Sequence, residues 1–115
     1  MKTNDFNKVV DEVTEKIKST LKRKASEYNL NDDRLSVFKH AGAMAEETPE
    51  KALYGFMLKH LISVTDMVNS EDTYSKELWN EKMTDIHCYL ILLNALLQDT
   101  ARMSCEQSQE KVNKK

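Results

Sequence analysis

One segment of this sequence, IHCYLILLNALL at residues 86–97, has ten apolar residues among its twelve, whereas the whole chain is only 40% apolar. A surface helix carries a single apolar stripe, so a helix that is apolar on nearly every side must be covered by other helices or by a second copy of the chain. The segment is also shorter than the roughly 20 apolar residues that cross a bilayer. We therefore expect a central helix in an oligomeric protein, and no association with a membrane.

The length and composition of the chain limit its fold and its partners. A chain of 115 residues has the size of one domain, and two glycines with one proline are too few for a turn-rich β-fold. The N-terminal residues lack the apolar segment of a secretory signal, and the two cysteines form no metal or disulfide pattern, so we expect a cytoplasmic protein. The formal net charge is −2, and the basic residues at 16–24 follow acidic ones at 11–15, so we expect no nucleic-acid partner.

Apolar residues recur at helical spacing in four segments, and no segment alternates between polar and apolar residues as a strand does. The four segments cover residues 4–25, 33–46, 49–68 and 75–102. Thr48 followed by Pro49 is a typical helix start, and Asn4 or Asp5 is expected to cap the first helix. The sequence therefore predicts an all-α fold, an antiparallel bundle of about four helices in residues 1–103. The polar residues 104–115 are predicted to be a disordered tail.

Two local features leave alternatives open. Gly42 lies in the middle of the second helix, which favours either close packing of a neighbouring segment or the approach of a ligand to the backbone. Lys22, Arg23 and Lys24 lie near the end of the first helix, where cations complement the helix dipole. The same three residues could instead form a basic patch for an anionic partner.

Polar residues on the third and fourth helices form the candidate site. Lys59 and Asp66 share a face of the third helix, and Glu81 and Asp85 share a face of the fourth with Tyr89. If the two helices pack antiparallel, Asp66 lies near Glu81 or Asp85. Such a group could bind Mg²⁺ through its carboxylates and a phosphate through Lys59. It could equally be an interhelical network of ion pairs.

The three histidines are expected to be structural. His60 follows Lys59 on the third helix and is expected to be partly buried with its polar atoms satisfied, although contact with a ligand is the alternative. His40 is expected on the surface. His87 has no partner at the spacing of a zinc ligand, so we predict no zinc site.

Residues 34–97 resemble a family of small all-helical proteins that bacteriophages and prophages encode. The matching features are Arg34 and Phe38 before a small-residue turn, the TPE helix start, the Lys59–His60 pair, and the group from Glu81 to Tyr89. The family lacks an agreed activity. The resemblance implies an oligomeric accessory protein of the host cytoplasm that binds a host protein or a nucleotide-like ligand and antagonises host defence or metabolism. The expected ligand-binding residues are Arg34, Lys59, His60, Asp66 and Tyr89.

A looser similarity connects the chain to the MazG-like all-α nucleotide pyrophosphatases. It implies Mg²⁺ as a cofactor held by Glu81 and Asp85, with Lys59 at a phosphate. The chain departs from that pattern because its acidic pair is spaced i, i+4 instead of i, i+3, and because the preceding helix lacks a Glu-x-x-Glu pair. We therefore expect a binding protein without assigned catalytic residues. A Mg²⁺-dependent nucleoside triphosphate pyrophosphatase, or a degenerate relative, is the alternative.

Overall fold

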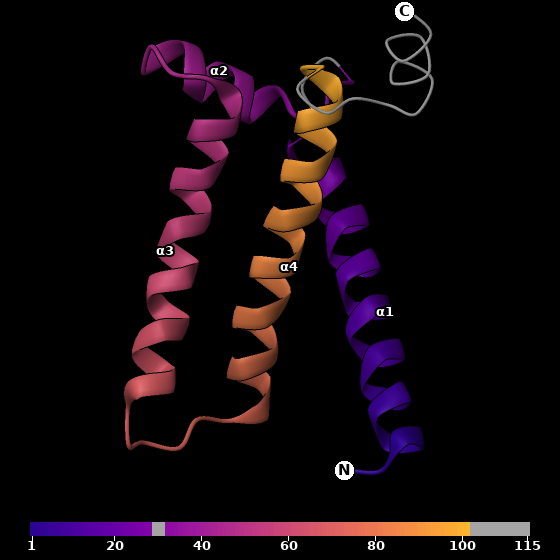
Figure 1. The fold of residues 1–115 in the computed structure, drawn as a ribbon. Helices are drawn as coiled ribbons and strands as arrows, with labels where there is room; N and C mark the ends of the chain where they lie inside the picture. Colours follow the sequence, from indigo (N-terminus) through magenta and orange to yellow (C-terminus); the bar gives the residue numbers. More distant parts are fainter. Residues whose placement is uncertain (29–31, 102–115) are drawn as a thin grey trace, which may run out of the picture.

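The computed structural model describes residues 1–28 and 32–101, and the secondary-structure elements in that part of the chain are all helices (Figure 1). The four helices are α1 (Thr3–Tyr28), α2 (Ser36–Met44), α3 (Pro49–Asn69) and α4 (Lys76–Asp99). This confirms the all-α class and the four predicted segments. The predicted polar tail at 104–115 lies outside the described residues.

Helix α4 is the central element, with α3 on one side and α1 on the other (Figure 1). The short loop between α3 and α4 makes these two helices antiparallel, as predicted. In contrast, α1 runs in the same direction as α4, because the chain crosses from α1 to α2 and α3 before it returns. The short helix α2 packs on α3 at the end of the molecule where α4 finishes. The bundle is therefore antiparallel only between α3 and α4.

The helix boundaries follow from specific caps. The Thr48 hydroxyl accepts a hydrogen bond from the Lys51 amide at 3.2 Å, and the Ser75 hydroxyl accepts one from the Leu78 amide at 3.1 Å. These bonds satisfy free amides in the first turns of α3 and α4, as the sequence predicts for Thr48. The prediction for the first helix was wrong, since α1 already begins at Thr3 and includes both proposed capping residues.

The start of α2 also differs from the prediction. The helix begins at Ser36 instead of residue 33. The reason is that a carboxylate oxygen of Asp33 accepts a hydrogen bond from the Leu35 amide at 2.9 Å. This local turn gives the backbone an alternative to the helical pattern.

The buried core lies where α2, α3 and α4 meet. Leu35, Phe38, Leu53 and Leu96 form it, and α4 packs further apolar side chains against it. Gly42 is buried here, and a Cβ atom at this position would lie 3.0 Å from the Glu47 carbonyl oxygen. The neighbour is backbone that leads into α3, so close packing explains this glycine.

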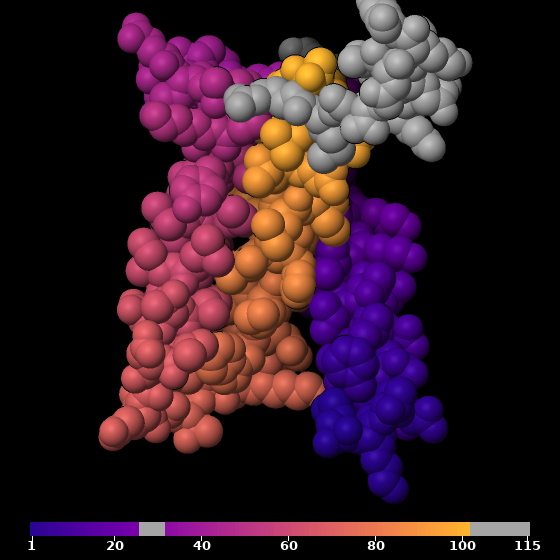
Figure 2. Space-filling view, in the orientation of Figure 1, coloured from indigo at the N-terminus to yellow at the C-terminus, as the bar shows by residue number. Residues whose placement is uncertain are grey.

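The apolar segment 86–97 is covered on two sides within one chain. Ile86, Cys88 and Leu96 are buried, but the side chains of Leu90 and Ile91 are 49% and 46% exposed. Figure 2 shows α4 uncovered between α3 and α1 on the face in view. The expectation of cover on nearly every side is therefore not met by α1 and α3 alone. The apolar spacing of α3 predicts that Phe56 and Val68 point inward, but both are exposed.

Helix α1 packs on α4 through its C-terminal half only. Thr20 is buried, whereas Phe6, Val9 and Val10 on the same apolar face are exposed. On α4, the face that contains the buried Thr84 continues toward the helix start as Glu81 and Glu77, at positions i−3 and i−7. The acidic start of α4 therefore offers no apolar surface to the first half of α1. None of the helices, within residues 1–28 and 32–101, is long and apolar enough to cross a membrane.

Candidate functional site

A half-open cavity of about 240 Å³ lies where all four helices or their connections converge. Three aromatic rings line it, one each from α2, α3 and α4: Phe38, Phe56 and Tyr89. The cations Lys24 and Arg34 line it as well, and the rest of the wall is apolar apart from one carboxylate. The cavity thus combines flat apolar surfaces with two positive charges.

Asp85 supplies that carboxylate and lies between two basic side chains. One of its oxygens is 3.9 Å from the Lys24 Nζ atom, and the other is 3.7 Å from the His60 Nδ1 atom. The Asp85 side chain is 22% exposed, so these contacts are partly shielded from solvent. Asp85 therefore connects α1 and α3 to the middle of α4.

Ring contacts fix the aromatic walls of the cavity. The His60 and Tyr89 rings lie 5.1 Å apart at 39°, and the Phe38 and Phe56 rings lie 5.9 Å apart in an edge-to-face arrangement. Both separations are within the range of favourable ring pairs. The Phe56 side chain is 40% exposed, so part of its surface is accessible to solvent.

Cys88 lies on the same wall and is almost completely buried. Burial raises the pKa of its thiol, while the positive charges of Lys24 and Arg34 oppose this rise and Asp85 adds to it. The thiol is therefore largely protonated at neutral pH. This arrangement is typical of a structural cysteine and does not activate a nucleophile.

The structure brings together four of the seven residues that the sequence selected. Arg34, Asp85 and Tyr89 line the cavity, and His60 contacts both Asp85 and Tyr89. His60 is partly buried and His40 is exposed, as predicted for both.

The other three selected residues, Lys59, Asp66 and Glu81, are exposed and lie outside the cavity lining. The ion-pair partners of Asp85 are Lys24 and His60, not Lys59. Among residues 1–28 and 32–101, no three His, Cys, Asp or Glu side chains are grouped so that they could hold a metal ion. The role of Glu81 and Asp85 as Mg²⁺ ligands stays a prediction.

Lys24 is an important cavity residue that the sequence did not select for the candidate site, although it belongs to the possible basic patch of Lys22, Arg23 and Lys24. It was assigned to the last turn of the first helix, but α1 continues to Tyr28 and its last turn contains no basic residue. A signal was present, because Lys24 follows Leu21 by three residues and Ile17 by seven, which places it on the apolar face. A cation on an otherwise apolar face indicates a partner on the neighbouring helix.

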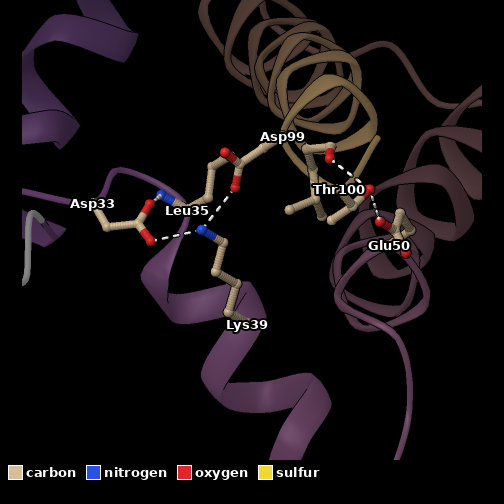
Figure 3. Close-up of polar contacts among 7 residues, drawn as sticks. Asp33, Leu35, Lys39, Glu50, Asp99 and Thr100 are labelled. Atoms are coloured by element: carbon tan, nitrogen blue, oxygen red, sulfur yellow. Dashed lines mark hydrogen bonds and ion pairs between the residues drawn. The ribbon is translucent and has the colours of Figure 1, made fainter. Parts of the chain in front are cut away.

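A second polar cluster holds α2 against the end of α4 (Figure 3). The Lys39 Nζ atom lies 2.7 Å from carboxylate oxygens of both Asp33 and Asp99. Beside it, the Thr100 hydroxyl lies 2.6 Å from a carboxylate oxygen of Glu50 at the start of α3. The Lys39 contacts hold α2, which carries Phe38, against the end of α4, and the Thr100 contact joins that end to the start of α3.

A comparison with protein families, curated proteins and solved structures finds no match for this chain. The described residues define the class directly: a small four-helix protein with an aromatic and cationic cavity beside its central helix.

Proposed function

We propose that this chain is an oligomeric binding protein that captures a nucleotide-like ligand, an aromatic base with phosphate groups, in the cavity beside α4. The observation that carries the proposal is the combination of three aromatic rings with Lys24 and Arg34 in one cavity. Aromatic side chains stack on nucleobases with about 1–3 kcal/mol per base. Guanidinium and ammonium groups are the usual protein partners of phosphate.

The size of the cavity agrees with partial enclosure of such a ligand. Its volume of about 240 Å³ is slightly below the roughly 300–1,000 Å³ of cavities that bury drug-sized molecules. We expect the base to lie against Phe56 and Tyr89. The phosphates then extend toward Lys24 and Arg34. Sequestration of a nucleotide-like signal would suit the antagonist of host defence that the phage-family resemblance implies.

Calorimetric titration with the common nucleoside triphosphates and their diphosphates tests the proposal. Lys24→Gln and Arg34→Gln should each weaken binding by at least about tenfold, because a charge-assisted hydrogen bond contributes roughly 1.5–3 kcal/mol. Lys18→Gln, which removes an exposed lysine from the same helix, is the matched control and should bind as the wild type does. Equal affinities for the Lys24 and Lys18 variants would contradict the proposal.

The pyrophosphatase alternative has one observation in its favour, which is that Asp85 lies in the same cavity as the two cations. It predicts that the protein releases pyrophosphate from a nucleoside triphosphate in the presence of Mg²⁺. Asp85→Asn should then abolish release, whereas a protein that binds nucleotides without any turnover supports the binding function. Glu81→Gln distinguishes the two further, since Glu81 is exposed outside the cavity and affects turnover only as a metal ligand.

A further inference from the structure

Two apolar stripes run along the uncovered sides of α3 and α4. Tyr54 and Leu58 are four residues apart on α3, and Met83 and Leu90 are seven apart on α4, so each pair shares a helix face. All four side chains are between 40% and 51% exposed. Monomeric soluble proteins rarely expose such continuous apolar stripes without a binding partner.

Both stripes lie on the same side of the molecule, opposite the cavity. On α3, Phe56 lines the cavity, and Leu58 is two residues further, about 200° around the helix. On α4, Leu92 lines the cavity, and Leu90 is two residues earlier, again about 200° away. Because α3 and α4 are packed together, the two stripes form one surface. We call Tyr54, Leu58, Met83 and Leu90, with Ile62 at the edge, the outer face.

The chemistry of the outer face is suited to a second copy of the chain. Thr65 and Asn94 are uncharged polar residues on these helix faces, and the charged residues there, Lys51 and Lys76, lie in the first turns of α3 and α4, at the ends of the outer face. Two copies can therefore meet over its centre without like-charge repulsion. The exposed charges Lys59 and Asp66 belong to another side of α3. An isologous dimer brings the same patch of both copies together, which an uncharged apolar centre permits.

The area of the outer face matches what a stable dimer needs. Its five apolar side chains are 40–54% exposed, and side chains of this size offer together on the order of 500 Å² at that exposure. A standard interface buries about 800 Å² per partner, and roughly 65% of the area of a homodimer interface is apolar. The apolar area of the outer face is therefore close to the apolar area that one partner contributes.

We infer that the outer face is the homodimer interface, where the α3–α4 pair of one chain packs on the α3–α4 pair of a second copy. The inference deepens the oligomeric part of the proposed function and rests on it. It also supplies the cover for residues 86–97 that α1 and α3 leave incomplete.

Sedimentation equilibrium of the full chain at micromolar concentrations tests this interface. The wild type should sediment with twice the 13.3 kDa of one copy. Leu58→Glu and Leu90→Glu should each weaken dimerisation by at least about a hundredfold, because a carboxylate would be buried without a partner. Met44→Glu is the matched control, since Met44 is an exposed apolar residue on α2 outside the outer face. Circular dichroism should show unchanged helix content in all three variants, because every substituted position is exposed in one chain.

Two results would overturn the inference: a strictly monomeric wild type, or a dimer that both Leu58→Glu and Leu90→Glu leave intact. Titration of Leu58→Glu with nucleotide separates this inference from the proposed binding function. A monomeric variant that still binds nucleotide supports the outer face and the cavity as independent sites. A wild-type dimer that binds no nucleotide would contradict the binding function alone.

Discussion

The Lys39 Nζ atom of α2 lies 2.7 Å from a carboxylate oxygen of Asp99, the last residue of α4. The same nitrogen lies 2.7 Å from Asp33, which precedes α2. One ammonium group therefore connects the entry of α2 to the end of the central helix. Because Phe38 is on the same short helix, this connection also fixes one wall of the cavity.

Stability should depend on pH through this cluster. The hydrogen bond from Lys39 holds the pKa of Asp33 below its ordinary value of 3.8, and the Leu35 amide adds to this effect. A carboxylate with a lowered pKa stabilises the fold above its unfolded-state pKa and loses this effect as the pH falls through the folded-state value. Lys39→Gln should therefore lower the urea midpoint at neutral pH, and its difference from the wild type should shrink below about pH 3.8.

The stability of the Lys39→Gln variant at alkaline pH provides a second test of these ion pairs. Hydrogen bonds to Asp33 and then Asp99 raise the pKa of Lys39 above its ordinary value of 10.5. This contribution is complete below pH 10.5 and is lost as the pH rises through the higher folded-state pKa. Lys18→Gln, at an exposed position on α1, serves as the control. A difference between Lys39→Gln and the wild type that stays constant at every pH would show that the ion pairs do not stabilise the fold.

The two glycines should respond in opposite directions to alanine. Gly42→Ala places a Cβ atom 3.0 Å from the Glu47 carbonyl oxygen and 3.1 Å from the Pro49 nitrogen, so we expect a loss of about 1–3 kcal/mol from overpacking. Gly55→Ala on α3 meets no atom within 4 Å, so it should stabilise the protein by roughly 0.5–1 kcal/mol. Thermal denaturation of both variants measures the two changes, and a stabilised Gly42→Ala would refute the close approach.

Glu46, which follows the end of α2, is a position where a substitution should stabilise the protein. Its φ angle is 57°, in the left-handed region, and the following Glu47 amide donates a 2.8 Å hydrogen bond to the Gly42 carbonyl. Glycine is the usual residue at such a helix end. Glu46→Gly should therefore raise the free energy of unfolding by about 1 kcal/mol, because a left-handed conformation costs other residues roughly 1–2 kcal/mol. Glu47→Gly, which lacks a positive φ angle at its position, should destabilise the protein in the same assay.

The reactivity of the Cys88 thiol can show whether a ligand occupies the cavity. In a Cys105→Ser variant it is the only cysteine of the chain, and burial raises its pKa above the ordinary value of 9.0. Its reaction with Ellman's reagent at neutral pH should be at least about tenfold slower than in denaturant, since only the accessible thiolate reacts. Because Cys88 lines the cavity, a saturating nucleotide should slow the reaction further. An equal rate with and without nucleotide would place any bound nucleotide elsewhere.

Local signals allowed the sequence to predict most of the fold. Thr48 and Pro49 defined the start of α3 to the residue, because capping involves neighbours within one turn. Segment 86–97 identified the central helix from its apolar residues alone. The direction of α1 was not predictable in this way, because its contact with α4 joins residues about 60 positions apart, such as Lys24 and Asp85.

Only part of the candidate site was predictable from the sequence, because the rest depends on contacts between residues that are far apart in the chain. Helical spacing correctly grouped Asp85 with Tyr89 and predicted that His60 on α3 is partly buried. It also grouped Lys59 and Asp66 with Asp85, but both are exposed outside the cavity lining. The pairing of Asp85 with Lys24 and His60 depends on contacts between helices, which spacing on a single helix does not report.

The position of α1 determines the order in which the helices can pack during translation. Its main contact in the described residues is with α4, which is made after the other three described helices, while α2, α3 and α4 contact their sequence neighbours. At translation rates of about 5–20 residues per second, α1 emerges several seconds before its docking site exists. A free helix of this length is only marginally stable in water. We therefore expect the α3–α4 hairpin to close before α1 docks on α4.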